Sequence, residues 1–149
     1  MKFVIQRVKH ASVTVDSNVI GKINNGFMVL IGVENADTKE IADKMVAKLV
    51  NMRIFQDEND KMNLSLLDIQ GEVLLISQFT LYGDARKGRR PNFMNALGGE
   101  EAKKFYDKFI EMMKETGLKV QTGIFGADMK VDIKNDGPVT ILLDSSRNF

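Results

Sequence analysis

Residues 72–82, Glu-Val-Leu-Leu-Ile-Ser-Gln-Phe-Thr-Leu-Tyr, constrain the fold more than any other stretch of this chain. Residues 73–76 form a continuous apolar run, which is typical of a short strand covered on both faces. Ser77, Gln78 and Thr80 follow without a glycine or proline, so the strand is expected to continue to the end of the stretch. A buried polar group without a partner costs roughly 1–3 kcal/mol. Either these side chains bond neighbouring backbone, or the strand runs from the core into a cleft where they face a ligand.

The size and composition are those of one soluble globular domain. The chain has 149 residues, of which 44% are hydrophobic and 28% charged. We expect a single domain over residues 1–149, because no Pro-rich linker, low-complexity segment or repeat interrupts it. No stretch approaches the ~18 apolar residues of a membrane span, and the apolar start is too short for a signal peptide, so a cytoplasmic location without membrane contact is expected. The absence of cysteine excludes disulfides, a thiolate nucleophile and a Cys-based zinc site.

Positive charge is concentrated in one loop. Twenty-one basic residues against twenty acidic ones give a formal charge of +1, which argues against a protein that coats DNA or RNA non-specifically. Residues 85–93, Ala-Arg-Lys-Gly-Arg-Arg-Pro-Asn-Phe, directly follow the central strand. The cations are Arg86, Lys87, Arg89 and Arg90. They form either a solvated charged loop or a local phosphate contact, with Phe93 available to stack on a base.

The hydrophobic pattern predicts an α+β fold, with largely antiparallel sheets of barrel-like or sandwich form and two helices packed against them. A first helix opens at residues 37–40, with Asp37 as N-cap and Glu40 at the capping-box position. A second runs from about residue 100 to 116 and ends at Gly117. A polar loop is expected at residues 83–99 and an irregular connection at 62–67. Besides the central strand, strands are expected at 2–8, 11–16, 19–23, 27–33, 53–55, 120–124, 129–133 and 139–143.

Common catalytic motifs are missing. There is no HExxH, P-loop or repeated carboxylate spacing, so neither metal nor nucleotide chemistry has support and no cofactor is expected. His10 is the only histidine, and it is expected in a turn between strands. A triad built on Ser77 would need this histidine, and Gly-x-Ser-x-Gly is absent. Residues 135–140, Asn-Asp-Gly-Pro-Val-Thr, are typical of a turn that enters a strand.

Several motifs together resemble one family over essentially the whole chain. They are Val-Ile-Gln-Arg-Val at 4–8, Ala-Ser-Val-Thr-Val at 11–15, Arg-Ile-Phe at 53–55, Met-Asn-Leu-Ser at 62–65, Ser-Gln-Phe-Thr-Leu-Tyr at 77–82, Lys-Gly-Arg-Arg-Pro at 87–91, Phe-Gly-Ala-Asp-Met at 125–129 and Asn-Asp-Gly-Pro-Val-Thr at 135–140. In this order they are similar to the D-aminoacyl-tRNA deacylases, also called D-tyrosyl-tRNA deacylases. The two signature motifs, at 77–82 and 135–140, show no departure from the family pattern.

The resemblance implies hydrolysis of the ester that joins a D-amino acid to the 3′-terminal ribose of tRNA. The implied catalytic residues are Ser77, Gln78, Phe79 and Thr80. Backbone N–H groups near Phe79 and Thr80 would stabilise the developing oxyanion. A threonine nucleophile needs a base and none is evident nearby, so the ribose 2′-hydroxyl is expected to assist, as in the family. Thr80 and Ser77 are then assigned to positioning rather than to a covalent role, and Gln78 to ordering the substrate or the strand.

The resemblance also implies a homodimer in which a cis Gly137-Pro138 peptide reaches into the partner's active site. A rigid backbone wall that leaves room only for hydrogen at the stereocentre would exclude L-amino acids, whereas glycyl esters would be poorly excluded. Phe125, Ala127 and Met129 are implied to line the terminal-adenosine pocket, and Arg7 is a candidate brace of the turn. Two alternatives stay open: a non-catalytic RNA-binding module, and an esterase for small D-amino-acid esters.

Overall fold

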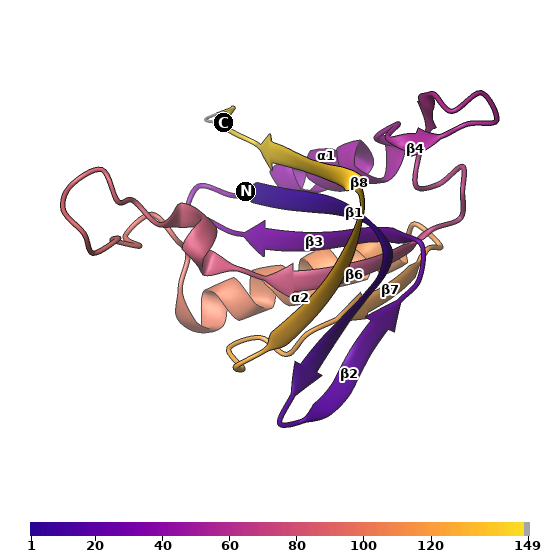
Figure 1. Ribbon diagram of the computed structural model, residues 1–149. Helices are drawn as coiled ribbons and strands as arrows, with labels where there is room; N and C mark the ends of the chain where they lie inside the picture. Colours follow the sequence, from indigo (N-terminus) through magenta and orange to yellow (C-terminus); the bar gives the residue numbers. More distant parts are fainter. Residues whose placement is uncertain (148–149) are drawn as a thin grey trace.

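The fold is a curved, mixed sheet with two helices against one face (Figure 1). The computed structural model describes residues 1–147. Its elements are β1 (Lys2–Val15), β2 (Asn18–Ile23), β3 (Gly26–Gly32), α1 (Lys39–Asn51), β4 (Phe55–Gln56), β5 (Met62–Leu64), β6 (Glu72–Ser77), the 3-10 helix η1 (Phe79–Tyr82), α2 (Gly99–Lys114), β7 (Lys119–Thr122) and β8 (Lys130–Asp144). The main sheet has the order β2-β1-β3-β6-β7, with β8 paired to β1, while β4 and β5 form a separate pair. The predicted α+β class is confirmed.

Parallel pairs occur where a helix lies between two strands. β1 pairs antiparallel with β2, β3 and β8, but β6 lies parallel to both β3 and β7. A parallel connection needs a crossover, which α1 and α2 provide. The sheet is therefore mixed, antiparallel around β1 and parallel around β6.

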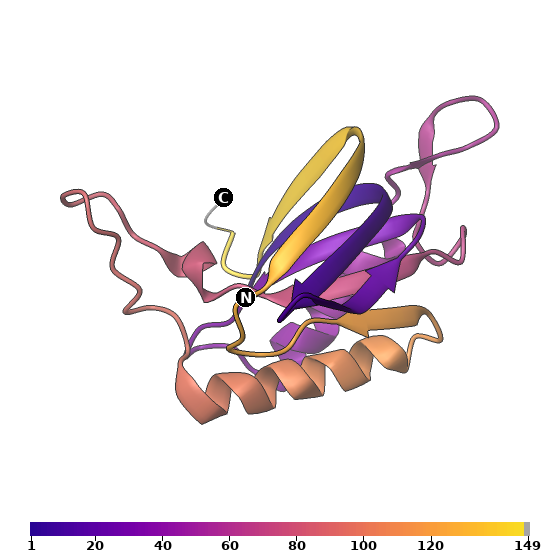
Figure 2. The same ribbon diagram turned by 60° about the horizontal axis from the view of Figure 1, so that its bottom comes forward.

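The apolar run of the central strand is buried on both faces, as expected. Val73 and Leu75 belong to the larger core cluster, which includes the inner faces of both helices. Leu74 and Ile76 belong to a second cluster on the opposite face, together with residues of β1 and β2. Figure 2 shows how the sheet curls, with α2 lying along one face and β8 arching over the other. This curl gives the sheet the expected barrel-like form.

Three expectations about strands were wrong. The segments 2–8 and 11–16 form the single strand β1, so His10 lies within a strand, exposed, and not in a turn. The segments 129–133 and 139–143 likewise form the single strand β8, which contains the Gly137-Pro138 bond. The pairing of β1 with β8 accommodates these segments through register shifts on either side of Val8. The connection at 62–67 is partly regular, because residues 62–64 pair with β4.

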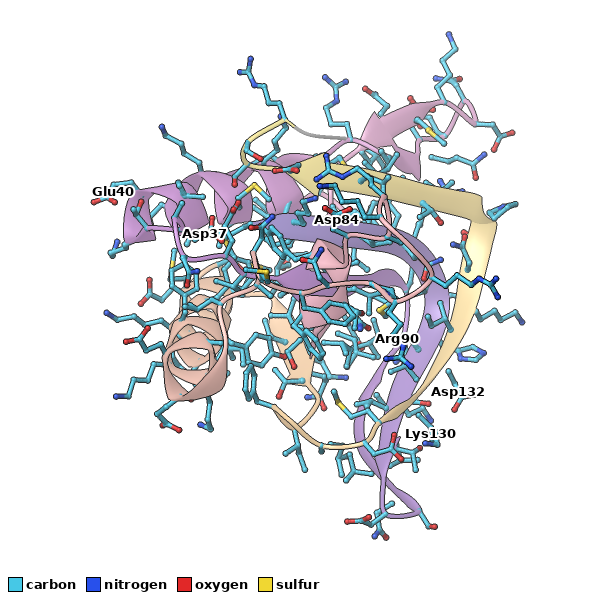
Figure 3. The ribbon with its side chains drawn as sticks, turned by 90° about the vertical axis from the view of Figure 1, so that its left-hand side faces the viewer. Asp37, Glu40, Asp84, Arg90, Lys130 and Asp132 are labelled. Atoms are coloured by element: carbon cyan, nitrogen blue, oxygen red, sulfur yellow. The ribbon has the colours of Figure 1, made fainter. Side chains whose placement is uncertain are left out.

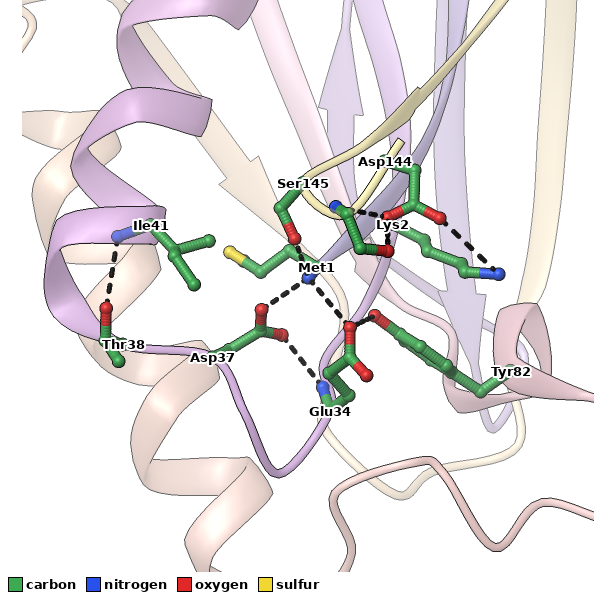
Figure 4. Close-up of polar contacts among 10 residues, drawn as sticks. Met1, Lys2, Glu34, Asp37, Thr38, Ile41, Tyr82, Asp144 and Ser145 are labelled. Atoms are coloured by element: carbon green, nitrogen blue, oxygen red, sulfur yellow. Dashed lines mark hydrogen bonds and ion pairs between the residues drawn. The ribbon is translucent and has the colours of Figure 1, made fainter. Parts of the chain in front are cut away.

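The first helix begins one residue later than expected. Thr38 is its N-cap, and the Thr38 side chain accepts a hydrogen bond from the Ile41 amide at 3.3 Å. The Asp37 carboxylate instead accepts a hydrogen bond from the amino group of Met1 and a second one from the backbone N–H of Glu34 at 2.8 Å (Figure 4). Burial raises the pKa of Asp37 despite the nearby ammonium group. Because the Asp37 carboxylate pairs with the buried amino group of Met1, Thr38 and not Asp37 caps the helix.

The second helix lies close to its predicted position. It spans Gly99–Lys114, and Gly117 adopts the expected left-handed conformation at φ 82°. Its buried residues include Ala102, Tyr106 and Phe109, while Phe105 is only half-buried. No helix within residues 1–147 combines the length and apolar character needed to cross a membrane.

Tyr106 ties α2 to the central strand. Its buried hydroxyl donates a hydrogen bond to the Leu75 carbonyl at 2.7 Å, and the same carbonyl accepts the Gly123 amide at 3.3 Å. Burial raises the pKa of Tyr106 well above its ordinary value. The hydroxyl therefore stays protonated, and its hydrogen bond holds α2 against the C-terminal part of β6.

We expect Tyr106→Phe to lower the free energy of unfolding by about 1 kcal/mol, the usual net contribution of a buried hydrogen bond. Urea denaturation followed by far-UV circular dichroism measures this as a lower midpoint at an unchanged slope. Lys103→Ala, on the exposed face of the same helix, is the matched control and should change stability by less than about 0.5 kcal/mol. An unchanged midpoint for Tyr106→Phe would show that the bond contributes nothing.

Candidate active site

The central strand ends earlier than its sequence suggests. β6 stops at Ser77, and Phe79–Tyr82 forms the 3-10 helix η1, so the expected continuation of the strand beyond Ser77 was wrong. The Gln78 amide donates to the Ile31 carbonyl at 2.7 Å, and the neighbouring strand β3 ends one residue later, at Gly32. With no strand left to pair with, the chain turns into η1. A Cβ atom on Gly32 would lie 3.1 Å from the Leu81 and Tyr82 side chains, so glycine there lets η1 pack closely.

This change of direction opens a cavity of about 630 Å³ at the end of β6. Its lining brings together Ser77, Gln78 and Phe79 with Phe125, Ala127 and Met129, two groups of expected site residues that lie far apart in sequence. Thr80 is not part of this lining, but its hydroxyl accepts a hydrogen bond from the Gln78 side chain. The remaining lining residues are Ile76, Phe93, Ala96, Leu97, Gly98, Gly99, Gly126 and Val131.

Of these remaining residues, the sequence indicated only Phe93 as a ligand contact, although Ile76 lies in the central apolar run and Gly126 in the motif at 125–129. Residues 96–99 reach the cavity because the Leu97 amide donates to the Val33 carbonyl at 2.8 Å, which holds the end of the loop against the sheet. A long-range backbone bond of this kind leaves no pattern in the sequence.

The cavity carries no ionisable side chain among its lining residues in the described chain. Its polar groups are the Ser77 hydroxyl, the Gln78 amide and the backbone. A helix leaves its first amide groups without an internal acceptor, and in η1 these belong to Phe79 and Thr80. Such amides can stabilise an oxyanion without any change in protonation. The arrangement suits a reaction in which negative charge develops on oxygen and the substrate carries its own proton acceptor.

The cation-rich loop projects from the body of the protein next to this cavity (Figures 1 and 2). Arg86 is engaged within the loop: its guanidinium donates to both carboxylate oxygens of Asp84, at 2.9 and 2.6 Å. These bonds hold the pKa of Asp84 at about 2. Lys87, Arg89 and Arg90 are exposed. Figure 3 shows Asp84 near the start of the loop and Arg90 farther along it.

The Gly137-Pro138 peptide bond is cis and lies outside the cavity of its own chain. Arg7, only 5% exposed, donates from Nε to the Asp136 carbonyl at 3.0 Å and from Nη1 to the Ile54 carbonyl at 2.6 Å. The Asn135 side chain accepts the Val139 amide at 2.7 Å and donates to the Val139 carbonyl at 3.2 Å. Residues 135–140 thus lie within β8 and not in the expected turn, and side chains hold this segment on both sides, with Arg7 bonded to the Asp136 carbonyl.

Gly137 has little room for a side chain. Its φ is +138°, and an added Cβ would lie 2.7 Å from the Val139 side chain and 3.1 Å from the Arg7 guanidinium. We expect Gly137→Ala to lower the free energy of unfolding by about 1–3 kcal/mol, as for other residues forced into rare backbone conformations. Gly88→Ala is the matched control, because Gly88 also has a positive φ of 78° but nothing within 4 Å. The control should lose roughly 1 kcal/mol or less, and equal losses in denaturant titrations would contradict the crowding at Gly137.

Comparison with known proteins identifies the family. The profile described as D-Tyr-tRNA(Tyr) deacylase matches residues 4–144. Curated proteins named D-aminoacyl-tRNA deacylase from Clostridium beijerinckii and Clostridium perfringens are 64% and 62% identical over the whole of both chains. A solved structure named c-Myc DNA Unwinding Element Binding Protein is 44% identical, with a TM-score of 0.91 over 97% of this chain and 98% of its own. Another, described as a probable eukaryotic D-amino acid tRNA deacylase, shares the fold at 18% identity, with a TM-score of 0.83 over 95% of this chain and 97% of its own. The chain belongs to the D-Tyr-tRNA(Tyr) deacylase family.

Proposed function

We propose that this protein is a hydrolase that cleaves the ester bond of D-aminoacyl-tRNA and releases free D-amino acid and tRNA. The observation that carries this proposal is the full-length identity of 64% to a curated D-aminoacyl-tRNA deacylase. The uncharged cavity at the end of β6 is consistent with it, because ester hydrolysis with backbone donors needs no ionised side chain at the reacting carbon. Its site of action is the cytoplasm, where aminoacyl-tRNA is used.

In this mechanism water attacks the carbonyl carbon of the ester. The amides of Phe79 and Thr80 donate hydrogen bonds to the carbonyl oxygen as it gains negative charge. The ribose 2′-hydroxyl of the substrate assists the attack, which removes the need for a protein base. The carbon–oxygen bond to the ribose then breaks, and the proton lost by the attacking water passes by way of the 2′-hydroxyl to the departing ribose oxygen. Ser77 positions the substrate, while Gln78, bonded to the Thr80 hydroxyl, orders the turn that presents the donors.

The terminal adenosine occupies the apolar side of the cavity, against Phe125, Ala127 and Met129. Lys87, Arg89 and Arg90 contact tRNA phosphates from the projecting loop. Arg86 supports these phosphate contacts mainly by fixing the shape of the loop through its two hydrogen bonds to Asp84. Three phosphate contacts to a single strand give a salt slope of roughly −2.

Chiral selection comes from the turn of a second subunit. Gly137 and Pro138 are exposed and lie outside their own cavity, so they are free to enter the cavity of a partner in a homodimer. Exchanging D for L swaps hydrogen and side chain on one carbon. A backbone wall at that position rejects the L-enantiomer by clash, and it rejects glycyl-tRNA poorly because glycine has no side chain.

A second candidate is nucleic-acid binding without turnover. It is favoured by the 44% identical structure, whose name refers to binding of a DNA element, and by the exposed cations of the loop. It requires that binding survives changes at Gly137 and Thr80 and that no amino acid is released. A small D-amino-acid esterase, the remaining alternative, would show little dependence on salt.

We expect wild-type protein to deacylate D-tyrosyl-tRNA at least about a hundredfold faster than L-tyrosyl-tRNA, because a steric clash of several kcal/mol opposes the L-form. Release of labelled tyrosine from matched substrates measures the ratio. Thr80→Val should slow the D-reaction by roughly tenfold, the loss of one positioning hydrogen bond. Equal rates on both enantiomers would defeat chiral proofreading, and release from neither would favour the binding module.

Mixed dimers test whether the turn acts across subunits. Ala127→Phe fills the cavity. Gly137→Ala adds a methyl group to the backbone wall where the proposal leaves room only for hydrogen, so each homodimer should be nearly inactive on the D-substrate. In an equal mixture half of the dimers are mixed, and each mixed dimer keeps one site with an open cavity and an intact turn. We expect about a quarter of wild-type activity to return after mixing and reassembly. Activity that stays at the level of the separate variants would place both changes in the same site.

A further inference from the structure

An exposed pair of aromatic rings lies at the mouth of the cavity. Phe79 is 56% exposed and Phe93 is 36% exposed, and both line the cavity. Their ring centroids are 5.1 Å apart with an interplanar angle of 69°, an edge-to-face arrangement. An edge-to-face contact covers one face of one ring only, and the exposed fractions show that part of each residue remains accessible. The pair therefore offers exposed aromatic surface beside the cavity.

Phe93 is held in place by the backbone around it. Asp84 and Asn92 exchange two hydrogen bonds, at 2.8 and 3.0 Å, which close the loop immediately before Phe93. The Ala96 amide donates to the Phe93 carbonyl at 3.0 Å. A Cβ atom on Gly83 would lie 3.0 Å from the Phe93 ring, so the glycine lets the ring pack against the end of η1. The position of the ring is thus fixed between the cavity and the cationic tip of the loop.

We propose that the Phe79–Phe93 pair is a stacking site for the unpaired nucleobase that precedes the terminal adenosine. The proposal rests on the proposed function, because the cavity must hold that adenosine. A nucleobase stacks on an aromatic face regardless of its identity. The exposed cations Lys87, Arg89 and Arg90 lie in the same loop, where the phosphates of the strand would continue. This charge favours a nucleic-acid strand over an apolar peptide as the occupant.

The site predicts that affinity grows with the number of nucleotides and that Phe93 is responsible for the gain. Isothermal titration calorimetry compares the trinucleotide CpCpA, the sequence at the tRNA 3′ end, with adenosine monophosphate. We expect wild type to bind CpCpA about tenfold or more tightly than the mononucleotide, the gain of one base–aromatic stack. Phe93→Ala should remove most of this ratio, and Phe93→Tyr should restore it. Met94→Ala is the matched control, because Met94 is 84% exposed and neighbours the pair in sequence without belonging to it.

Two outcomes would overturn the stacking site. The first is equal affinity of wild type for the two ligands. The second is an affinity ratio that Phe93→Ala leaves unchanged; if both ligands lose affinity equally, the ring only shapes the cavity. Because neither ligand carries an aminoacyl ester, these binding measurements are separate from turnover. If wild type binds CpCpA through Phe93 but hydrolyses no D-aminoacyl-tRNA, the proposed function fails and the stacking site stands.

Discussion

The last backbone hydrogen bond between β3 and β6 determines where the site forms. The backbone N–H of Gln78 donates to the Ile31 carbonyl at 2.7 Å, and β3 ends one residue after Ile31, at Gly32. The chain must then satisfy its own backbone groups, which it does through the i to i+3 bonds of η1, from Leu81 to Gln78 and from Gly83 to Thr80. The first amides of that helix, those of Phe79 and Thr80, have no acceptor within it. The end of the pairing between β3 and β6 thus leaves hydrogen-bond donors next to a cavity that Phe79 lines.

An uncharged cavity narrows the chemistry that it can support. Burial of a catalytic carboxylate or imidazole would be costly among Phe125, Met129 and Val131, unless a partner charge accompanied it. Backbone amides carry no such cost, because they are dipoles whose positions are fixed by the fold. The site is therefore suited to stabilising charge that the substrate develops, and less suited to abstracting a proton. The proposed substrate, which supplies its own hydroxyl beside the ester, is consistent with this limit.

The sequence predicted the elements better than the places where they change direction. Residues 73–76 were correctly assigned to a doubly buried strand, because continuous apolar runs leave few alternatives. The end of that strand was missed, since it depends on the length of β3 and not on Gln78 or Thr80 themselves. Likewise the Asp37 carboxylate was assigned to a helix cap, whereas the amino group of Met1, 36 residues away, engages it. The family resemblance implied a pocket lined by Phe125 and Met129, and these residues share one cavity with Ser77. It gave no indication of residues 96–99, whose position depends on a bond to Val33.

Selection by exclusion requires a wall that does not yield, and the bonds around Gly137 have the character of such a wall. The Asn135 side chain bonds both the amide and the carbonyl of Val139, as a neighbouring strand would. On the other side, Arg7 is buried and holds the Asp136 carbonyl, so its position is itself fixed by the core. A loop held only by its ends could move aside for a larger substituent at modest cost. A segment whose backbone is bonded at the residues before and after Gly137 has to break those bonds to move, and that cost is what a discriminating contact needs.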